Sequence, residues 1–161
     1  MFSIGDQIVY PMHGAGIIEA IEEKMILGES RRYYILHIPF GDMKVMIPCD
    51  STDSVGVRGI ITKSQLSAIE KALTDDSTEM SDNWNRRYRD NMEKLKTGDL
   101  TDVCEVVRNL MRIDRIKKLS TGEKKLLSNA KQILLSELIL VCKKNSDEIS
   151  VFIEELVLRN I

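Results

Sequence analysis

The hydrophobic pattern of this chain changes period once, just after Gly59, and that single change limits what the chain can fold into. Before it, Ile, Val and Tyr gather in four short stretches separated by Gly, Pro, Asp and Ser, which is typical of strands and turns. After it, apolar residues return every three or four positions, which is the spacing of amphipathic helices. Strands followed by helices, rather than the two in alternation, predict an α+β fold.

The first part of the chain predicts a small antiparallel β-barrel. Gly28 and Gly41 lie in gaps between apolar stretches and suit the positive φ angles of hairpin turns, so consecutive strands should pair as a meander. Four or five such strands cannot protect both faces and both edges as a flat sheet, so we expect a strongly curled barrel. The expected strands are residues 4–10, 17–26, 31–40 and 43–49.

The second part predicts a short helix, a linker and a compact helical domain. Thr62 and Gln65 have the spacing of a capping box ahead of the short helix. The stretch 74–83 is polar and acidic and is the candidate linker, and four amphipathic helices with short connections follow it. The predicted units are a barrel over 1–60, a short helix with an acidic linker over 61–83, and a helical domain over 84–161.

Composition excludes several classes of protein. No run approaches the roughly 20 apolar residues of a membrane span, and the first residues have neither a basic start nor a cleavable apolar stretch. We therefore expect a cytoplasmic protein with no membrane partner. Cys49, Cys104 and Cys142 are isolated and form no CxxC pair, so neither a disulfide framework nor a structural zinc site is expected.

The sequence offers little material for catalysis. Its two histidines, His13 and His37, both lie in the strand region, and no second metal ligand stands at a suitable spacing from either. Gly14-Ala15-Gly16 is followed by no helical pattern and no Lys-Ser or Lys-Thr, so it predicts a chain corner rather than a phosphate-binding loop. We expect no enzyme activity, no cofactor, no bound metal and no small-molecule substrate.

The net charge of −2 conceals an uneven distribution of charge. Residues 1–83 carry 7 basic and 13 acidic side chains, whereas residues 84–131 carry 13 basic and 7 acidic ones. A basic middle beside an acidic first half suggests two surfaces with different partners, one an anionic polymer and the other a protein. The alternative is that the basic stretch is only the solvated face of a helical domain.

The only tryptophan, Trp84, begins a predicted helix among three arginines, Arg86, Arg87 and Arg89. Guanidinium groups bind phosphates, and a large apolar side chain beside them can wedge or stack against bases. A second interpretation stays open, because Trp84 also continues the apolar spacing of its helix and could complete the core. Nothing resembles a helix that reads base sequence, so any DNA contact should depend on phosphates and shape.

Taken together, these motifs resemble one protein family along nearly the whole chain. In the first half they are Gly5-Asp6, Val9-Tyr10-Pro11, His13-Gly14, Gly16, Tyr33-Tyr34-Ile35-Leu36, Met43 and Ile47-Pro48. In the second half they are Trp84-x-Arg86-Arg87-Tyr88, Glu93-Lys94-Leu95-Lys96-x-Gly98-Asp99-Leu100, Glu105-Val106-Val107-Arg108-x-Leu110 and Leu119-Ser120-x-Gly122-Glu123-Lys124. Their order and identity are similar to those of CarD-like (CdnL) bacterial transcription regulators.

The resemblance implies a Tudor-like barrel that docks on the β subunit of RNA polymerase and a helical domain that contacts promoter DNA at the upstream edge of the transcription bubble. It implies a minor-groove wedge at Trp84 and stabilisation of the open promoter complex. Some family members carry a basic residue where this chain has Met46, which implies a more apolar polymerase contact here. The same barrel occurs in transcription-repair coupling factors, but this chain has none of the P-loop motifs of their motor.

The resemblance also assigns roles to individual residues. The residues expected to contact DNA, in the minor groove or on the phosphate backbone, are Trp84, Arg86, Arg87, Arg89 and Lys124. The residues expected to contact polymerase are Lys24, Lys44 and Met46. The alternative function is that of an adaptor that joins proteins through a barrel and a helical domain without contacting DNA, with Trp84 in the core.

Overall fold

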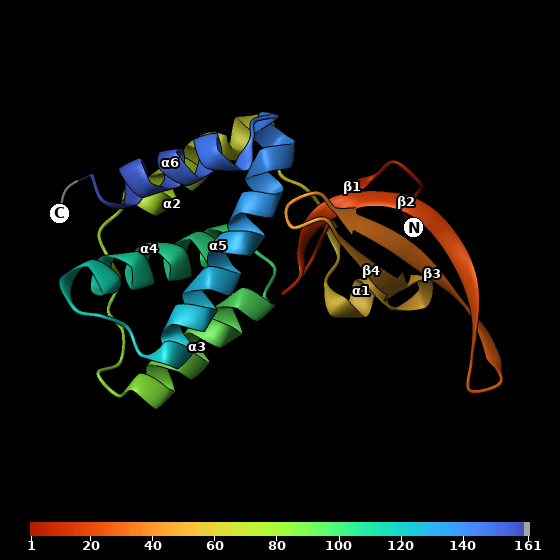
Figure 1. The fold of residues 1–161 in the computed structure, drawn as a ribbon, viewed down its shortest axis with the longest axis horizontal. Coiled ribbons are helices and arrows are strands. Elements are labelled where there is room, and N and C mark those ends of the chain that lie inside the picture. Colours follow the sequence, from red (N-terminus) through yellow and green to blue (C-terminus); the bar gives the residue numbers. More distant parts are fainter. Residues whose placement is uncertain (160–161) are drawn as a thin grey trace.

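The computed structural model describes residues 1–159 and contains a five-stranded antiparallel sheet followed by helices (Figure 1). The strands lie in the order β4-β3-β2-β1-β5. Their apolar side chains form one core, made by Ile8, Ile18, Tyr34, Leu36, Ile38 and Ile47. The strands are β1 (Gln7–Tyr10), β2 (Gly14–Ile26), β3 (Glu29–Ile38), β4 (Met43–Pro48) and β5 (Arg58–Gly59).

The α+β class and the meander of β1 to β4 are confirmed, but the sheet curls without closing. A register shift between Ile18 and Ala20 bends β2 around the core. Within the described residues β4 and β5 do not pair, so the expected strongly curled barrel is open between these two strands. The physical reason is that β5 has only two residues, and the chain between the two edges coils into η1 (Cys49–Ser51) and α1 (Thr52–Val55).

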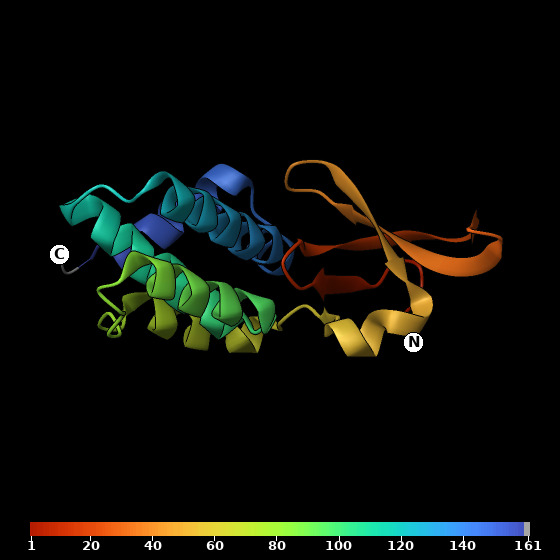
Figure 2. The ribbon, with the colours of Figure 1, turned by 90° about the horizontal axis from the view of Figure 1, so that it is seen from below.

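The β2–β3 hairpin is much longer than the rest of the sheet and reaches away from the helices, as Figures 1 and 2 both show. Its turn places Leu27 and Gly28 at positive φ, 52° and 80°. Two consecutive residues of this kind match the right-handed twist of the strands and keep the hairpin tight.

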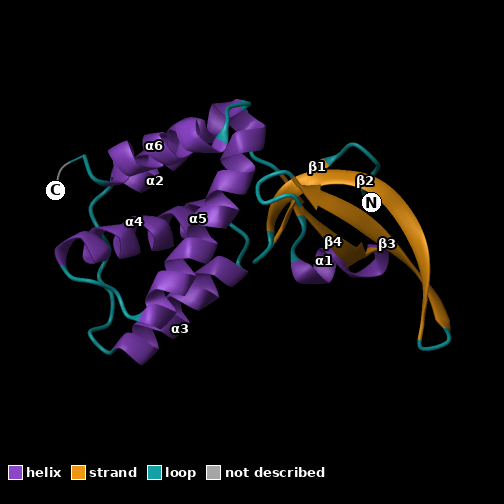
Figure 3. Ribbon diagram, in the orientation of Figure 1, coloured by secondary structure: helices purple, strands orange, loops and turns teal. Residues whose placement is uncertain are grey.

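The second part of the chain forms the predicted helices, coloured purple in Figure 3. Asn83, Asp99, Ser120 and Asn145 each stand at a helix start and accept a hydrogen bond from a backbone N–H of the first turn. The helices are η2 (Lys63–Gln65), α2 (Leu66–Thr74), α3 (Trp84–Lys96), α4 (Leu100–Ile116), α5 (Thr121–Cys142) and α6 (Ser146–Val157).

The helix α2 shares the core of the helices that follow it. Ile69 and Leu73 are buried in the same cluster as the apolar faces of α4, α5 and α6. At the end of α2, Arg108 donates to the Ala72 carbonyl at 2.8 Å and Arg112 donates to the Asp75 carbonyl at 2.7 Å. Two cations therefore satisfy carbonyls that the helix leaves unpaired.

The stretch predicted as a linker joins α2 to α3 and is held against α4. The Thr78 hydroxyl accepts a hydrogen bond from the Asn109 side chain at 2.7 Å and donates to Glu105 at 2.6 Å. The chain passes from sheet to helices earlier, at β5 and the residues after it, where Ile61 already packs against the helical core. No helix within residues 1–159 is long and apolar enough to cross a membrane.

Candidate nucleic-acid interface

The first turn of α3 presents Trp84 to solvent. Asn83 caps the helix by accepting a hydrogen bond from the Arg86 backbone N–H at 3.2 Å, so the helix begins with Trp84 itself. Further along the same helix Leu95 is buried and Tyr88 packs on the core, whereas Trp84 remains 54% exposed. Trp84 therefore lies at the surface and does not complete the core.

Arg86 and Arg89 follow Trp84 on α3, two and five residues later. Both are exposed, and in the described part of the chain neither takes part in a salt bridge. With Tyr88, Met92 and Lys96 they line a shallow groove of about 600 Å³ along α3. Asp90 and Glu93 also line this groove, so its three cations stand beside two carboxylates and the apolar side chains of Tyr88 and Met92.

Arg87 differs from its two neighbours because its guanidinium is already engaged. Its Nε and Nη2 donate to the two carboxylate oxygens of Glu123, each at 2.7 Å, and its Nη1 donates to the Ser81 carbonyl at 3.3 Å. The pairing lowers the pKa of the Glu123 carboxyl and raises the pKa of the Arg87 guanidinium. Among the arginines expected to contact DNA, Arg87 is therefore the one whose guanidinium group binds other residues of the protein.

The same pair brings the start of α5 next to the start of α3. Glu123 is only 2% exposed, and the following residue, Lys124, is exposed at the first turn of α5. Sequence reasoning missed the partner of Glu123, because the Ser120–Glu123 spacing predicts a capping box. The Ser120 half of that box is present, since its hydroxyl accepts the Glu123 backbone N–H at 3.3 Å. The Glu123 carboxylate is bound by Arg87 instead.

The residues expected to contact polymerase share one face of the sheet. In the strand register Lys24 pairs with Arg31, Met46 with Ile35 and Lys44 with His37. These three partners alternate along β3, so their side chains point to the same side. Lys44 and Met46 are neighbours on β4, whereas Lys24 lies on the projecting hairpin.

The charges on this face are partly neutralised. Lys44 is 2.9 Å from Glu19, and this carboxylate raises the pKa of the Lys44 amine. Lys24 is 3.7 Å from Glu22. Met46 is exposed. The face therefore combines paired charges with an exposed apolar side chain, which is a composition suited to a protein partner.

Within residues 1–159 no three His, Cys, Asp or Glu side chains converge as metal ligands. Burial raises the pKa of the Cys104 thiol, so this cysteine stays protonated at neutral pH.

Both halves of the chain are similar to known protein families. Residues 2–61 match the family described as CarD-like/TRCF RID domain, and residues 68–154 match the family described as CarD, C-terminal domain. The chain is also 44% identical over 141 residues to a Bacillus subtilis (strain 168) protein named "Putative transcription factor YdeB". That alignment covers 88% of this chain and 92% of the relative.

Proposed function

The chain belongs to the CarD-like family of transcription factors, and on that premise we propose that it stabilises the open promoter complex by holding RNA polymerase and promoter DNA at once. In this proposal the sheet docks on the polymerase β subunit, and the first turn of α3 contacts DNA at the upstream edge of the bubble. No catalytic step is required.

The observation that carries the proposal is the exposure of Trp84 in the first turn of a helix that also exposes Arg86 and Arg89. A large indole held in water at the start of a helix gains contact area when it enters the minor groove and separates two base pairs. Unstacking costs a few kcal/mol per step in intact duplex, and less where the bubble already distorts the DNA. The wedge thus prefers the open promoter to closed duplex.

The basic residues around Trp84 supply affinity without sequence specificity. Arg86 and Arg89 form no salt bridge within residues 1–159 and can bind phosphates, and Lys124 adds a charge from the start of α5. Such contacts release counterions, so DNA binding should weaken steeply with salt. In this proposal Arg87 orients α3 through its pair with Glu123, and Arg86 and Arg89 bind the phosphates.

The proposal that the sheet docks on polymerase rests on the family and on the face of the sheet that carries paired charges and an exposed methionine. Lys24, Lys44 and Met46 are the residues proposed to contact the β subunit. Met46 would add an apolar contact between the two lysines. Once the sheet is docked, DNA contact becomes intramolecular, so weak DNA affinity suffices.

The thermodynamic effect equals the difference between affinity for the open and the closed complex. A tenfold longer open-complex lifetime corresponds to about 1.4 kcal/mol of preferential binding. One inserted side chain and a few phosphate contacts can supply that difference.

The test compares open-complex lifetime on one promoter, with a bacterial RNA polymerase, for wild type, Trp84→Ala and Val151→Ala. Val151, on α6, is 53% exposed and serves as the matched exposed apolar control. We expect wild type and Val151→Ala to lengthen the lifetime equally, and Trp84→Ala to bind polymerase normally but lose the effect. A Trp84→Ala variant as effective as wild type would instead support the adaptor that does not contact DNA.

A further inference from the structure

A buried carboxylate on α5 is held entirely by donors from the chain segment that leaves the sheet. Glu137 is fully buried. Its two oxygens accept hydrogen bonds from Nη1 and Nη2 of Arg58 at 2.9 and 2.8 Å, and from the Ile61 backbone N–H at 2.8 Å. Within the described structure, the charge of a helical residue is thus satisfied only when β5 and the residues after it stay in place.

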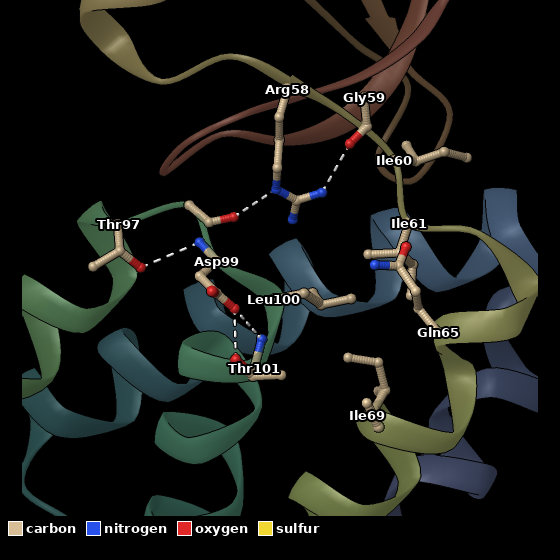
Figure 4. A pocket seen from close by; sticks show the side chains of 12 residues that line it. Arg58, Gly59, Ile60, Ile61, Gln65, Ile69, Thr97, Asp99, Leu100 and Thr101 are labelled. Atoms are coloured by element: carbon tan, nitrogen blue, oxygen red, sulfur yellow. Dashed lines mark hydrogen bonds between the residues drawn. The ribbon is translucent and has the colours of Figure 1, made fainter.

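Arg58 extends the connection to a second helical element. Its Nε donates to the Gly98 carbonyl at 2.9 Å, in the turn between α3 and α4, while its Nη1 also donates to the Gly59 carbonyl at 3.0 Å (Figure 4). A planar guanidinium that binds a carboxylate through two N–H groups fixes direction as well as distance. One side chain of the sheet therefore fixes two separate parts of the helical domain.

The residue before Glu137 makes the second direct connection between the domains. The Ser136 hydroxyl accepts a hydrogen bond from the Ala15 backbone N–H at 2.8 Å and donates to the Ile133 carbonyl at 2.6 Å. This approach is so close that a Cβ on Gly14 would lie 2.7 Å from the Ser136 oxygen. In the turn between α3 and α4, a Cβ on Gly98 would lie 2.9 Å from the Pro11 side chain.

Apolar packing across the same boundary is limited. Met12, Phe40 and Ile61 are only partly buried against the helical core. A groove of about 540 Å³, lined by Arg58, Gly59, Ile60 and the α3–α4 turn, opens beside them (Figure 4). Apolar contact is non-directional, so the directional bonds of Arg58, Ser136 and Glu137 are what set the angle between sheet and helices.

We infer that Arg58, Ser136 and Glu137 form an interdomain clasp that fixes this angle, and that the fixed angle delivers Trp84 to the DNA when the sheet is bound to polymerase. The second half of this inference rests on the proposed function, whereas the first half does not. These three are positioning residues, since they act through the placement of Trp84 and touch neither partner. A rigid connection raises the effective concentration of Trp84 at its target, whereas a loose one spreads it over many orientations.

The first experiment measures the interdomain distance in the free full-length protein by double electron–electron resonance. Spin labels are placed at Leu27→Cys on the hairpin tip and Ile116→Cys at the end of α4, two exposed positions on opposite domains, in a background with Cys49 and Cys142 replaced by Ser. We expect a narrow distribution for the parent and at least a doubled width for Glu137→Gln. Glu105→Gln is the matched control, because the Glu105 carboxylate forms a salt bridge with the Lys94 amine, at 2.9 Å, within the helical domain.

Two milder variants keep the test decisive if Glu137→Gln does not fold. Ser136→Ala removes one bond of the clasp, and Arg58→Lys keeps the charge but cannot bind both oxygens and Gly98 together. Each should widen the distribution less than Glu137→Gln does. Distributions as narrow as the parent's in every folded clasp variant would overturn the clasp.

The second experiment measures open-complex lifetime for the same variants beside Trp84→Ala. We expect Glu137→Gln to bind polymerase and free DNA like wild type. Its extension of the open-complex lifetime should be smaller than that of wild type by about threefold or more. A widened distribution with an unchanged lifetime would overturn the role of the angle while leaving the clasp in place. Full activity of Trp84→Ala would overturn the proposed function instead, and the distance measurement would still decide whether the clasp exists.

Discussion

Two arginine–glutamate pairs in residues 1–159 have nearly the same chemistry but hold different parts of the protein together. In each, a guanidinium binds both oxygens of an almost fully buried carboxylate, at 2.7 and 2.7 Å for Arg87 with Glu123 and at 2.9 and 2.8 Å for Arg58 with Glu137. The first pair joins α3 to α5 within the helical domain, and the second joins that domain to the sheet. The same bond thus orients a helix in one place and a domain in the other.

The surroundings of the two carboxylates explain why they should differ in strength. Glu137 accepts a third short hydrogen bond, from the Ile61 backbone N–H, whereas the additional contact of Glu123 is a hydroxyl of Ser120 at 3.4 Å. A buried donor left without a partner costs about 1–3 kcal/mol. Removing Glu137 therefore leaves more unsatisfied groups than removing Glu123.

The largest expected effect is on the free energy of unfolding. We expect Glu137→Ala to lower it by about 4–5 kcal/mol and Glu123→Ala by about 3 kcal/mol, because each leaves a partly buried arginine without its carboxylate and the first also leaves the Ile61 backbone N–H without its acceptor. Urea denaturation followed by circular dichroism measures both. The double variant Arg58→Met/Glu137→Met should recover much of the loss, since it removes the two charges of the pair together. An equal decrease in unfolding free energy for the two alanine variants would contradict the larger contribution of Glu137.

A smaller effect should appear as pH dependence of the pair within the helical domain. The hydrogen bonds from Arg87 lower the pKa of Glu123 below the ordinary value of 4.5 for a glutamate. The unfolded chain therefore binds a proton at higher pH than the folded chain does, and the pair stabilises the protein fully above pH 4.5. This stabilisation is lost as the pH falls through the lower pKa of the folded state.

The measurement is the difference in unfolding free energy between wild type and Glu123→Gln across acid pH. The gap should be constant near neutral pH and should close below pH 4.5. Arg87→Met in both backgrounds is the control, because without the arginine the pH dependence of the gap should largely vanish. A gap that stays constant through the acid range would show that the pair contributes no charge-dependent stability.

Much of the fold could be predicted because it depends on local pattern. The change of period after Gly59 gives the α+β order, and the structure confirms the capping box predicted at Thr62 and Gln65. The open edge of the sheet could not be predicted, because whether β4 and β5 meet depends on how the intervening segment coils.

The ion pairs could not be predicted, because their partners lie 36 and 79 residues apart. A count of charges treats Arg58, Arg87, Glu123 and Glu137 as four separate charges. The uneven distribution of charge along the chain does not show that they pair with one another in the fold. One signal was nevertheless available. Ser136 and Glu137 are the only polar residues in the apolar run 133–141, and a buried charge on such a helix requires a partner from elsewhere.

The smallest expected effect distinguishes the two pairs through a single side chain. Trp84 is the only tryptophan and is half exposed, so its fluorescence should be red-shifted and readily quenched by acrylamide in the free protein. Arg87 lies one turn from Trp84 on α3 and holds that turn to α5. Arg87→Met should therefore lower the fluorescence anisotropy and increase quenching slightly, because the first turn of α3 loses its anchor.

Arg58→Met should leave the same signal unchanged, because its pair lies at the other end of the helical domain and holds the domain rather than the turn. The two variants then separate local from global positioning, since only Arg58→Met should widen the interdomain distance distribution. A change of Trp84 fluorescence in Arg58→Met as large as in Arg87→Met would mean that the two pairs act through one rigid body. In that case orienting the helix and orienting the domain would be the same function.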